Sequence, residues 1–413
     1  MDDTAFGSRN RRGDWKPAEP LKYPPVFVWP PQPQQLIMLA FLLQPLAFGN
    51  WLTRIPAIQE RLGLGPAELA LALLGLPIGL LATIVFAGPI VARFGARATV
   101  LWSFPAFLVV MALPAFAQHI AMLFAALVLC GVTMSMLELG LNVVADEIEK
   151  AGGAAIMSRC HGFWSLGMTI GSLIGAGLGG AGLVPQWSAV LVSVAVLPFG
   201  MIAAHALPPA IVHVKPAHQA KSTGLFIPGW ALLGICVVAL GSNLLEGASA
   251  DWSAVYLTQV FGADAVSAGL GYSAYALMMA AGRFAGDWMR TKWGPVVVAR
   301  TCYVLATLGV VLIVVSPAYP LVLVGYALSG FGGSVGVPLA ISAAASVGDR
   351  PAATNVAMVT LVSLVGFLLG PPIIGVVAQH FGLRMGIGLL LLPVLIASIV
   401  VAGTLRRKAH VAN

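Results

Sequence analysis

Long apolar segments alternate with short polar turns along almost the whole chain. Each segment has about twenty residues, the length that a helix needs to cross the ~30 Å hydrocarbon core of a bilayer. Hydrocarbon offers no water to backbone groups, so each span must be helical, whereas a barrel would show alternating strands of about ten residues. The pattern predicts an all-α polytopic membrane protein. We expect twelve spans, at residues 34–57, 67–91, 98–117, 119–145, 158–182, 185–207, 226–258, 266–289, 295–316, 319–345, 352–379 and 384–404.

The composition favours the same class. The chain has 413 residues, of which 59% are apolar and only 9% are charged, and its mean hydropathy is +0.93. A water-soluble fold of this size needs far more polar surface, so a lipid bilayer is the expected surrounding. Polar stretches divide the chain into a disordered proline-rich tail (1–33), a six-helix bundle (34–207), a linker (208–225), a second six-helix bundle (226–405) and a short tail (406–413).

The positive charges are distributed as topology signals. The formal net charge is +7, and most lysines and arginines fall on one side of the bilayer if the N-terminus is cytoplasmic. The opposite side keeps only Arg54, Arg61 and Arg384. By the positive-inside rule both termini are cytoplasmic, which requires an even number of spans. The charge therefore indicates orientation in the membrane, and no nucleic-acid partner is expected.

The two halves resemble one another at an offset of 199 residues. The turn RFG at 93–95 aligns with KWG at 292–294, and both follow an even-numbered span. Duplicated six-helix halves joined by a cytoplasmic linker are typical of transporters with a binding site between the halves. The glycines that align are Gly63, Gly95, Gly131, Gly167 and Gly171 with Gly262, Gly294, Gly330, Gly366 and Gly370.

Residues 130–182 hold more polar side chains within apolar helices than any other stretch. Glu138 and Asn142 are four residues apart and share a helix face, and His161 and Ser165 do the same on the next helix. If these helices run antiparallel, Glu138 lies level with Ser165, and Asn142 with His161. This arrangement predicts a titratable cluster between the fourth and fifth spans.

The fifth span also carries a stripe of small residues. Glycines recur every four residues at 167, 171, 175 and 179. A stripe of this kind lets the backbone of a neighbouring helix approach closely inside a bilayer. The sequence therefore predicts a tight helix contact beside the titratable cluster.

Three titratable residues are candidates for proton coupling. An ionised carboxylate in hydrocarbon costs about 3 kcal/mol or more, so Glu138 needs a partner, water or a proton. It either loads and releases a proton during transport or permanently joins the fourth and fifth spans. Glu246 either faces the solute or pairs with Arg54 as an outer gate. His161 either relays protons or bonds to Asn142 or a carbonyl.

Other polar and aromatic residues lie on the same spans. Arg54 either binds an anionic group or extends to the interface beside Glu60. Aromatic side chains either stack on a ring-shaped solute or serve as packing and interface anchors. The candidate solute-binding residues are Asn50, Arg54, Asn142, Trp164, Asn243, Tyr275 and Tyr326.

No pattern for a metal, cofactor or catalytic site is present in the sequence. Cys130, Cys160, Cys236 and Cys302 lie in apolar segments without paired spacing, so we expect free thiols that pack as small hydrophobic side chains. The seven histidines are scattered, and the phosphate-binding GxxxxGK[ST] motif is missing. We expect a monomer without cofactors that is not an enzyme.

The turn AGPIVARFGARATV after the second span resembles the signature loop of the major facilitator superfamily. Gly88, Arg93, Gly95 and Arg97 match that loop, while Ala92 stands where the family has an acid. The resemblance implies a twelve-helix fold with an inner gate at this loop. The equivalent turn of the second half, AGRFAGDWMRTKWG, keeps Asp287 and Lys292 as gating candidates, and Asp251 is a candidate at the outer mouth.

Three further stretches resemble one bacterial branch of this superfamily. GNWLTRIP, SRCHGFWSLG and EGASADWSAVYL are similar to the branch that includes the rhizopine-associated membrane protein, and ELGLN at 138–142 resembles the fourth helix of fucose:proton symporters. The resemblance implies a proton-coupled permease of the bacterial inner membrane with a small, sugar- or polyol-like solute. Proton-driven export of amphipathic or toxic compounds and solute sensing without transport stay open as alternatives.

Overall fold

The computed structural model describes residues 8–9, 15–16, 32–152, 156–209, 228–348 and 350–411, and nearly all of them are helical. The first half contains α1 (Pro33–Leu62), α2 (Pro66–Leu73), α3 (Gly75–Phe94), α4 (Ala96–Ala112), the 3-10 turn η2 (Leu113–Phe116), α5 (Ile120–Gly152), α6 (Met157–Gly180) and α7 (Pro185–Ala206). The second half contains α8 (Trp230–Phe261), α9 (Ala265–Trp293), α10 (Pro295–Val315), α11 (Tyr319–Gly333), α12 (Gly336–Ala345), α13 (Ala352–Phe381), α14 (Leu383–Gly388) and α15 (Leu391–Val411).

The polar segments fall mostly outside the described residues. In the N-terminal tail, the two-residue strands β1 (Ser8–Arg9) and β2 (Trp15–Lys16) pair antiparallel. The rest of the predicted tail up to residue 31 and residues 210–227 of the linker region lie outside the described residues. The predicted disorder of the tail is therefore not addressed by the structure.

The helices begin and end close to the predicted limits of the spans. Among the differences, α5 and α15 end seven residues late, at Gly152 and Val411, and α1 continues through Pro45 and Pro56 to Leu62, beyond the predicted end at residue 57. A proline inside a membrane helix is tolerated because neighbouring groups satisfy the backbone that it leaves free. The helix stops instead at Gly63, whose φ of 63° closes the last turn in the left-handed conformation.

Ten helical stretches among the described residues are long and apolar enough to cross a membrane. The fifth and eighth predicted spans are missing from this set, although α6 and α9 have 24 and 29 residues. Their length suffices for a span, so their polarity separates them from the others. The fold is that of an all-helical polytopic membrane protein, and the count of twelve spans stays a prediction.

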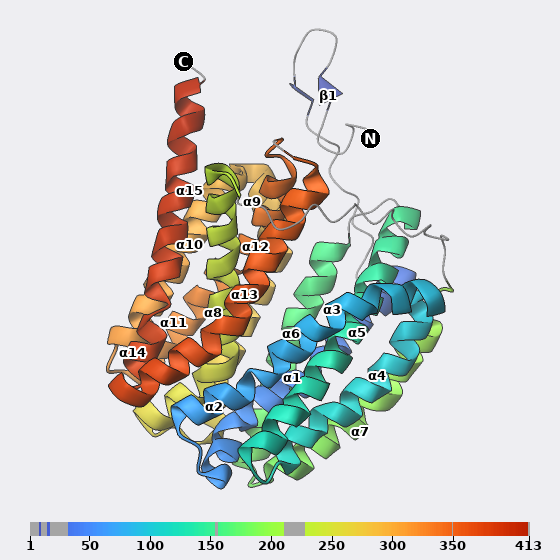
Figure 1. Cartoon of the computed structure of the whole chain (residues 1–413), viewed down its shortest axis with the longest axis vertical. Coiled ribbons are helices and arrows are strands. Elements are labelled where there is room, and N and C mark those ends of the chain that lie inside the picture. The colour runs from blue at the N-terminus through green and yellow to red at the C-terminus, as the bar shows by residue number, and fades with distance from the viewer. Residues whose placement is uncertain are drawn as a thin grey trace.

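The molecule consists of two helical bundles that lie side by side (Figure 1). In the first bundle α6 packs against α1, and α5 packs against α3 and α4; in the second, α13 packs against α8, and α11 packs against α9 and α10. Each contact of one half thus has its counterpart in the other. This repetition is what the offset of 199 residues predicts.

The sharp turns repeat as well. A positive φ is strained for any residue with a side chain, so it marks a position where glycine is required. Among the described residues only seven have a positive φ, and all seven are glycines. Six of them form equivalent pairs with nearly equal angles: Gly63 and Gly262 (63° and 64°), Gly95 and Gly294 (85° and 78°), and Gly182 and Gly382 (78° and 82°).

The predicted glycine stripe forms the contact between α6 and α1. A Cβ atom added at Gly171 would lie 2.3 Å from the carbonyl oxygen of Leu46, and one at Gly175 would lie 2.8 Å from that of Asn50. No side chain fits at such distances. The stripe therefore lets two membrane helices pack backbone to backbone, as predicted.

The two bundles meet along unequal seams. α6 packs along nearly its whole length against the first two thirds of α9, from Ser158 beside Arg283 to Gly180 beside Val266. In the second half, the helix equivalent to α6 is α13. Across the seam it packs against the short helix α2 and only slightly against α3. This contact lies at the distal end of the molecule, which we define as the end opposite the start of α1 and the end of α15 (Figure 1).

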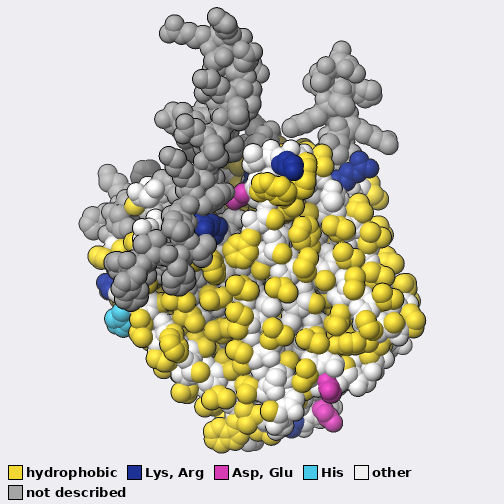
Figure 2. All heavy atoms as spheres, turned by 180° about the vertical axis from the view of Figure 1, so that it is seen from behind, with side chains coloured by type: hydrophobic (Ala, Val, Ile, Leu, Met, Phe, Trp, Pro, Cys, Tyr) yellow, Lys and Arg dark blue, Asp and Glu magenta, His cyan; other side chains and the backbone are white. Residues whose placement is uncertain are grey.

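Hydrophobic side chains cover the outer surface between the two ends. Figure 2 shows this apolar surface on one face of the molecule, with charged side chains gathered toward the ends. Exposed large side chains such as Trp187, Ile202 and Leu392, each more than 60% accessible, contribute to the apolar exterior. A surface of this composition fits the hydrocarbon of a bilayer.

Candidate functional site

A charged pair lies in the middle of the second half. Glu246 on α8 and Arg283 on α9 approach to 3.4 Å between Oε2 and Nη2. Their side chains are 19% and 16% exposed. This ion pair joins two different helices, whereas the pairs Lys150–Asp146 and Arg290–Asp287 join neighbours within α5 and within α9.

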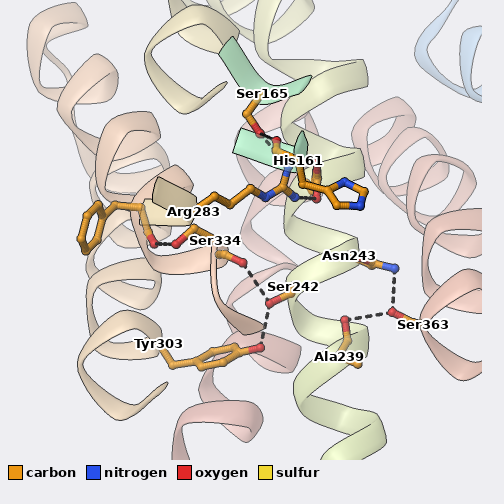
Figure 3. Close-up of polar contacts among 12 residues, drawn as sticks. His161, Ser165, Ala239, Ser242, Asn243, Arg283, Tyr303, Ser334 and Ser363 are labelled. Atoms are coloured by element: carbon orange, nitrogen blue, oxygen red, sulfur yellow. Dashed lines mark hydrogen bonds and ion pairs between the residues drawn. The ribbon is translucent and has the colours of Figure 1, made fainter. Parts of the chain in front are cut away.

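Arg283 also reaches across to the first half. Its Nη1 donates a hydrogen bond to Ser165 Oγ on α6 at 2.6 Å, as Figure 3 shows. Its guanidinium carbon lies 5.9 Å from the centre of the Trp164 ring, and its backbone carbonyl accepts a hydrogen bond from Ser158 Oγ. One arginine thus connects three residues of α6 with the acid on α8.

Small residues bring α6 and α9 close enough for these contacts. The ring of Phe284 lies directly over Gly162, and Ser172 Oγ hydrogen-bonds to Ser273 Oγ at 2.7 Å. Nearer the distal end, Gly269 packs against Ala176. Because bulkier side chains would hold the helices apart, the sequence of α6 and α9 determines where Arg283 can reach.

A second acid lies near this pair, on α5. Glu138 is half-buried, and the charges of Glu138 and Glu246 are close enough to interact. The side chain of Gln44 from α1 lies beside Glu138. Gln44 is fully buried and its side chain interacts with the Glu138 carboxyl, but its amide makes no hydrogen bond of standard length and angle among the described residues. A buried amide without a well-formed hydrogen bond is costly, so Gln44 is a candidate for contact with a solute or with a rearranged Glu138.

The predicted pairing of α5 with α6 is wrong. α6 packs against α1 and α9, while its contact with α5 is slight. Asn142 Nδ2 donates to the carbonyl oxygen of Glu138 within its own helix, so it is not bonded to His161. The predicted bond between the fourth and fifth spans through Glu138 is likewise not formed. The physical reason is the glycine stripe, which selects α1 as the close neighbour of α6.

His161 lies near Arg283 without bonding to it. Its ring packs edge to face against Phe41 of α1, with ring centres 5.5 Å apart. The Arg283 guanidinium lies within electrostatic range of the imidazole. Among the described residues no hydrogen-bond partner of the ring is recorded, so the predicted bond to Asn142 or a carbonyl is not present.

Arg54 and Asn50 both form hydrogen bonds within the first half. The Arg54 guanidinium donates to the carbonyl oxygen of Leu183 beyond the end of α6, and it packs against Gly179. Asn50 Oδ1 accepts a hydrogen bond from Ser188 Oγ on α7 at 2.7 Å. The predicted alternative of an Arg54 and Glu246 gate is wrong, because Glu246 pairs with Arg283.

The remaining solute-binding candidates are Asn243, Tyr275 and Tyr326 of the second half. Asn243 Nδ2 donates to Ser363 Oγ of α13 at 2.6 Å, which Figure 3 also shows. Tyr275 is fully buried and stacks on Tyr272 with ring centres 6.0 Å apart. The hydroxyls of Tyr275 and Tyr326 are buried without a partner among the described residues. Tyr275 lies within electrostatic range of Glu246 and Arg283, whereas for Tyr326 no such charge is recorded.

The gating candidates lie apart from one another. Gly95 turns the chain between α3 and α4, and Arg97 Nη2 donates to the carbonyl oxygen of His205 at 2.6 Å. The Arg93 guanidinium lies over the ring of its neighbour Phe94. For Asp251, half-buried on α8, no hydrogen bond or ion pair is recorded among the described residues. The structure therefore gives the positions of these residues, and their role in gating stays a prediction.

The candidate latch of the second half does not join Asp287 to Lys292. Asp287 pairs with Arg290 at 3.7 Å, and the Lys292 ammonium lies 4.9 Å from the centre of the Trp288 ring. All four residues lie on the last two turns of α9. The acid and the lysine thus each contact another neighbour on the same helix.

Arg283 and Gln44 are the residues that the sequence reasoning missed. Arg283 was identifiable, because it interrupts the apolar run ALMMAAGRF, and an arginine inside a membrane helix is expensive and usually functional. Gln44 has a weaker signal, since one glutamine in an apolar helix is common. Its importance is visible only from its burial and its missing partners.

A family model provides the identification. The model described as Major Facilitator Superfamily matches residues 37–246 and again residues 231–412. The chain belongs to the major facilitator superfamily. The two matches correspond to the two bundles, and the family and its curated relatives are transporters and not enzymes.

Curated relatives of this major facilitator cover most of the chain. An uncharacterised transporter of Sinorhizobium fredii, y4wD, is 32% identical over 86% of this chain and 93% of its own length. An uncharacterised MFS-type transporter of Yersinia pestis is 31% identical over 86% and 92%, and the membrane protein MosC of Rhizobium meliloti is 28% identical over 89% and 88%. The predicted membership of the superfamily is confirmed.

Solved transporter structures share the fold. A mutant of the nucleoside transporter NupG superposes with a TM-score of 0.70 at 13% identity, over 90% of this chain and 99% of that one. A bacterial homologue of the human lysosomal transporter Spinster, in an inward-facing and occupied conformation, superposes with a TM-score of 0.67 at 18% identity, over 90% and 96%. At this identity the likeness concerns the fold alone.

Proposed function

We propose that this major facilitator is a proton-coupled secondary transporter that moves a small polar solute by alternating access. It resides in the bacterial inner membrane with both termini in the cytoplasm. The observation that carries the proposal is the set of contacts of Arg283, which joins Glu246 of the second half to Ser165 of the first. Because Arg283 connects the two bundles, a change in the charge of Glu246 alters the contact that holds the bundles together.

The unequal seams support alternating access. α6 packs along nearly its whole length against α9, whereas α13 contacts α2 and barely reaches α3. A second arrangement, with α13 packed along α3 and apart from α2, would expose the site to the distal side. Because the halves are built alike, both arrangements use equivalent helix surfaces.

Two carboxylates support proton coupling. Glu138 and Glu246 lie near enough for their charges to interact, while only Glu246 has an ion-pair partner among the described residues. Two neighbouring carboxylates hold a shared proton more readily than either one alone, because ionising both is opposed by repulsion. We assign the loading and release of the coupling proton to Glu138, with Glu246 as the second carrier.

The solute-binding surface combines groups from both halves. Gln44 and Trp164 contribute from the first half, and Asn243 and Tyr275 from the second. The unbonded polar atoms of Gln44, Trp164 and Tyr275 can hydrogen-bond to a solute with several hydroxyl groups, in keeping with the sugar- or polyol-like resemblance.

The test begins with a thermal-shift screen of the purified protein against sugars, polyols and amphipathic drugs. The solute found is then used in proteoliposomes with wild-type protein, Glu138→Gln and the surface control Glu60→Gln. We expect Glu138→Gln to retain exchange of labelled solute across the membrane but to lose accumulation driven by a pH gradient. Unchanged accumulation would remove Glu138 from the coupling step, and stabilisation only by amphipathic drugs would favour export instead.

A further inference from the structure

Arg283 and Glu246 join a permanent charge to a removable one. A guanidinium stays protonated in proteins, whereas a carboxylate can take up a proton. Glu246 is the only acid paired with Arg283 among the described residues. Whenever Glu246 becomes neutral, Arg283 therefore loses its counter-charge, while Ser165 still holds it between the halves.

The geometry leaves Arg283 ready for another anion. Its contact with Glu246 is a single approach of 3.4 Å, longer than the 2.7–2.9 Å typical of a charge-assisted hydrogen bond. The planar fork can hold a carboxylate through two parallel bonds, and this pair does not use that mode. Trp164, over which the guanidinium lies, has a buried indole N–H without a partner among the described residues. The indole N–H of Trp164 and the remaining N–H groups of Arg283 are therefore available to bind an anion.

We propose that the transported solute carries an anionic group, of the carboxylate class, which replaces Glu246 on Arg283. This inference rests on the proposed function and names its substrate class. As the anion binds, one proton enters with it and neutralises the displaced carboxyl of Glu246, directly or by way of Glu138. The solute's negative charge and the proton's positive charge cancel, so transport is electroneutral.

The positive charge of Arg283 favours an anion over a cation or a neutral polyol. The titratable groups within electrostatic range of the pair are Glu138 from α5, His161 from α6, and Tyr272 and Tyr275 from α9, and Asp251 of α8 lies near Tyr272. A cationic solute beside Arg283 would be repelled. A neutral solute would not replace the charge that Glu246 withdraws from the partly buried guanidinium when it takes up a proton, and that loss is costly in a low-dielectric interior.

Three solutes that share one carbon skeleton test the charge preference. Gluconate, glucitol and glucamine differ only in an end group that is anionic, neutral or cationic, and each is titrated against the full-length protein in a thermal-shift assay. We expect gluconate alone to raise the unfolding temperature. Glu246→Gln removes the competing carboxylate, so the gluconate concentration at half effect should fall about tenfold. Arg283→Gln should abolish the effect, and the control Arg290→Gln should preserve it.

A second measurement does not depend on the sugar skeleton. Glu246→Ala leaves space beside Arg283, and acetate is expected to stabilise this variant but not the double variant Glu246→Ala with Arg283→Gln. Equal stabilisation of both variants, or of neither, would overturn the proposal. An equal or larger effect of glucitol or glucamine than of gluconate would overturn it as well.

Transport measurements separate this inference from the proposed function. Uptake of the bound anion should respond to a pH gradient and be unchanged by a potassium potential set with valinomycin. A dependence on the membrane potential would overturn electroneutral coupling. Selective anion binding without any flux would leave the assignment of Arg283 intact and would refute the transport function itself.

Discussion

Gln259 Nε2 donates a hydrogen bond to Gln59 Oε1 at 3.1 Å, and the two residues lie 200 positions apart. Each sits near the distal end of the first helix of its half, so the bond joins nearly equivalent positions of the repeat. A second contact at the same end runs from the backbone N–H of Ala67 to Gln379 Oε1. The distal end is therefore closed by neutral hydrogen bonds between side chains and backbone of the two halves.

We predict that charge at this position controls opening of the distal end. In the variant Gln59→Glu with Gln259→Glu, repulsion should separate the halves, whereas Gln59→Glu with Gln259→Lys should keep them together. Spin labels at Leu71→Cys and Phe381→Cys, both exposed and on α2 and α13, report the separation by pulsed EPR. The four native cysteines are buried and should stay unlabelled. Equal distances in both variants would show that this contact does not close the distal end.

The glycine stripe predicts a position-dependent loss of stability. A Cβ at Gly171 would lie 2.3 Å from the Leu46 carbonyl oxygen, so Gly171→Ala must push α1 and α6 apart. Overpacking of this kind costs about 1–3 kcal/mol. Gly177→Ala, on the same helix but facing open space, should be neutral or slightly stabilising, since alanine favours helix. Thermal unfolding of the two variants measures the difference, and equal unfolding temperatures would contradict the close packing.

The sequence predicts the positions of the helices and the relation of the halves well. Apolar length fixes the spans, because hydrocarbon thickness sets how many residues a crossing helix needs. Glycine spacing identifies the tight α6 contact, since only residues without side chains permit it. The four buried cysteines agree with the prediction that they pack as small hydrophobic side chains.

The sequence does not predict which polar residues meet. Glu138 and His161 lie on consecutive helices, yet α1 contacts both helices more extensively than they contact each other. Arg54 and Arg283 are each an arginine in a membrane helix, and nothing local reveals that one binds the Leu183 carbonyl and the other Glu246. Helix neighbours and rotations follow from packing of the whole bundle, which periodicity along one helix does not encode.

Gln44 should be required for function and dispensable for stability. Its amide is fully buried and makes no hydrogen bond of standard length and angle among the described residues, so Gln44→Leu removes unsatisfied polar atoms and should leave the unfolding temperature unchanged or raise it. The same change removes the polar neighbour of Glu138 and should weaken solute binding and uptake. Gln34→Leu, nearer the start of α1, is the matched control. A destabilised Gln44→Leu would instead indicate a structural hydrogen bond.

Asp264 is expected to make the stability of the folded protein depend on pH in the acid range. Its carboxylate lies in the turn before α9 and accepts a hydrogen bond from the backbone N–H of Ser267 at 2.7 Å, which lowers the pKa of this carboxyl. A lowered pKa means that the cap stabilises the folded protein at any pH above the unfolded value of about 4 and loses that effect as the pH falls through the folded value.

Acid should therefore loosen the first turn of α9, at the end of the helix far from Arg283. Asp264→Asn keeps a capping side chain but cannot titrate, so its unfolding temperature should fall less than that of the wild type between pH 6 and pH 3. Glu60→Gln, which changes an exposed acid at the end of α1, serves as the control and should follow the wild type. Parallel curves for Asp264→Asn and wild type would mean that the acid response originates elsewhere. Hydrogen exchange of the amides in the first turn of α9 would locate the loss, since only that turn depends on the cap.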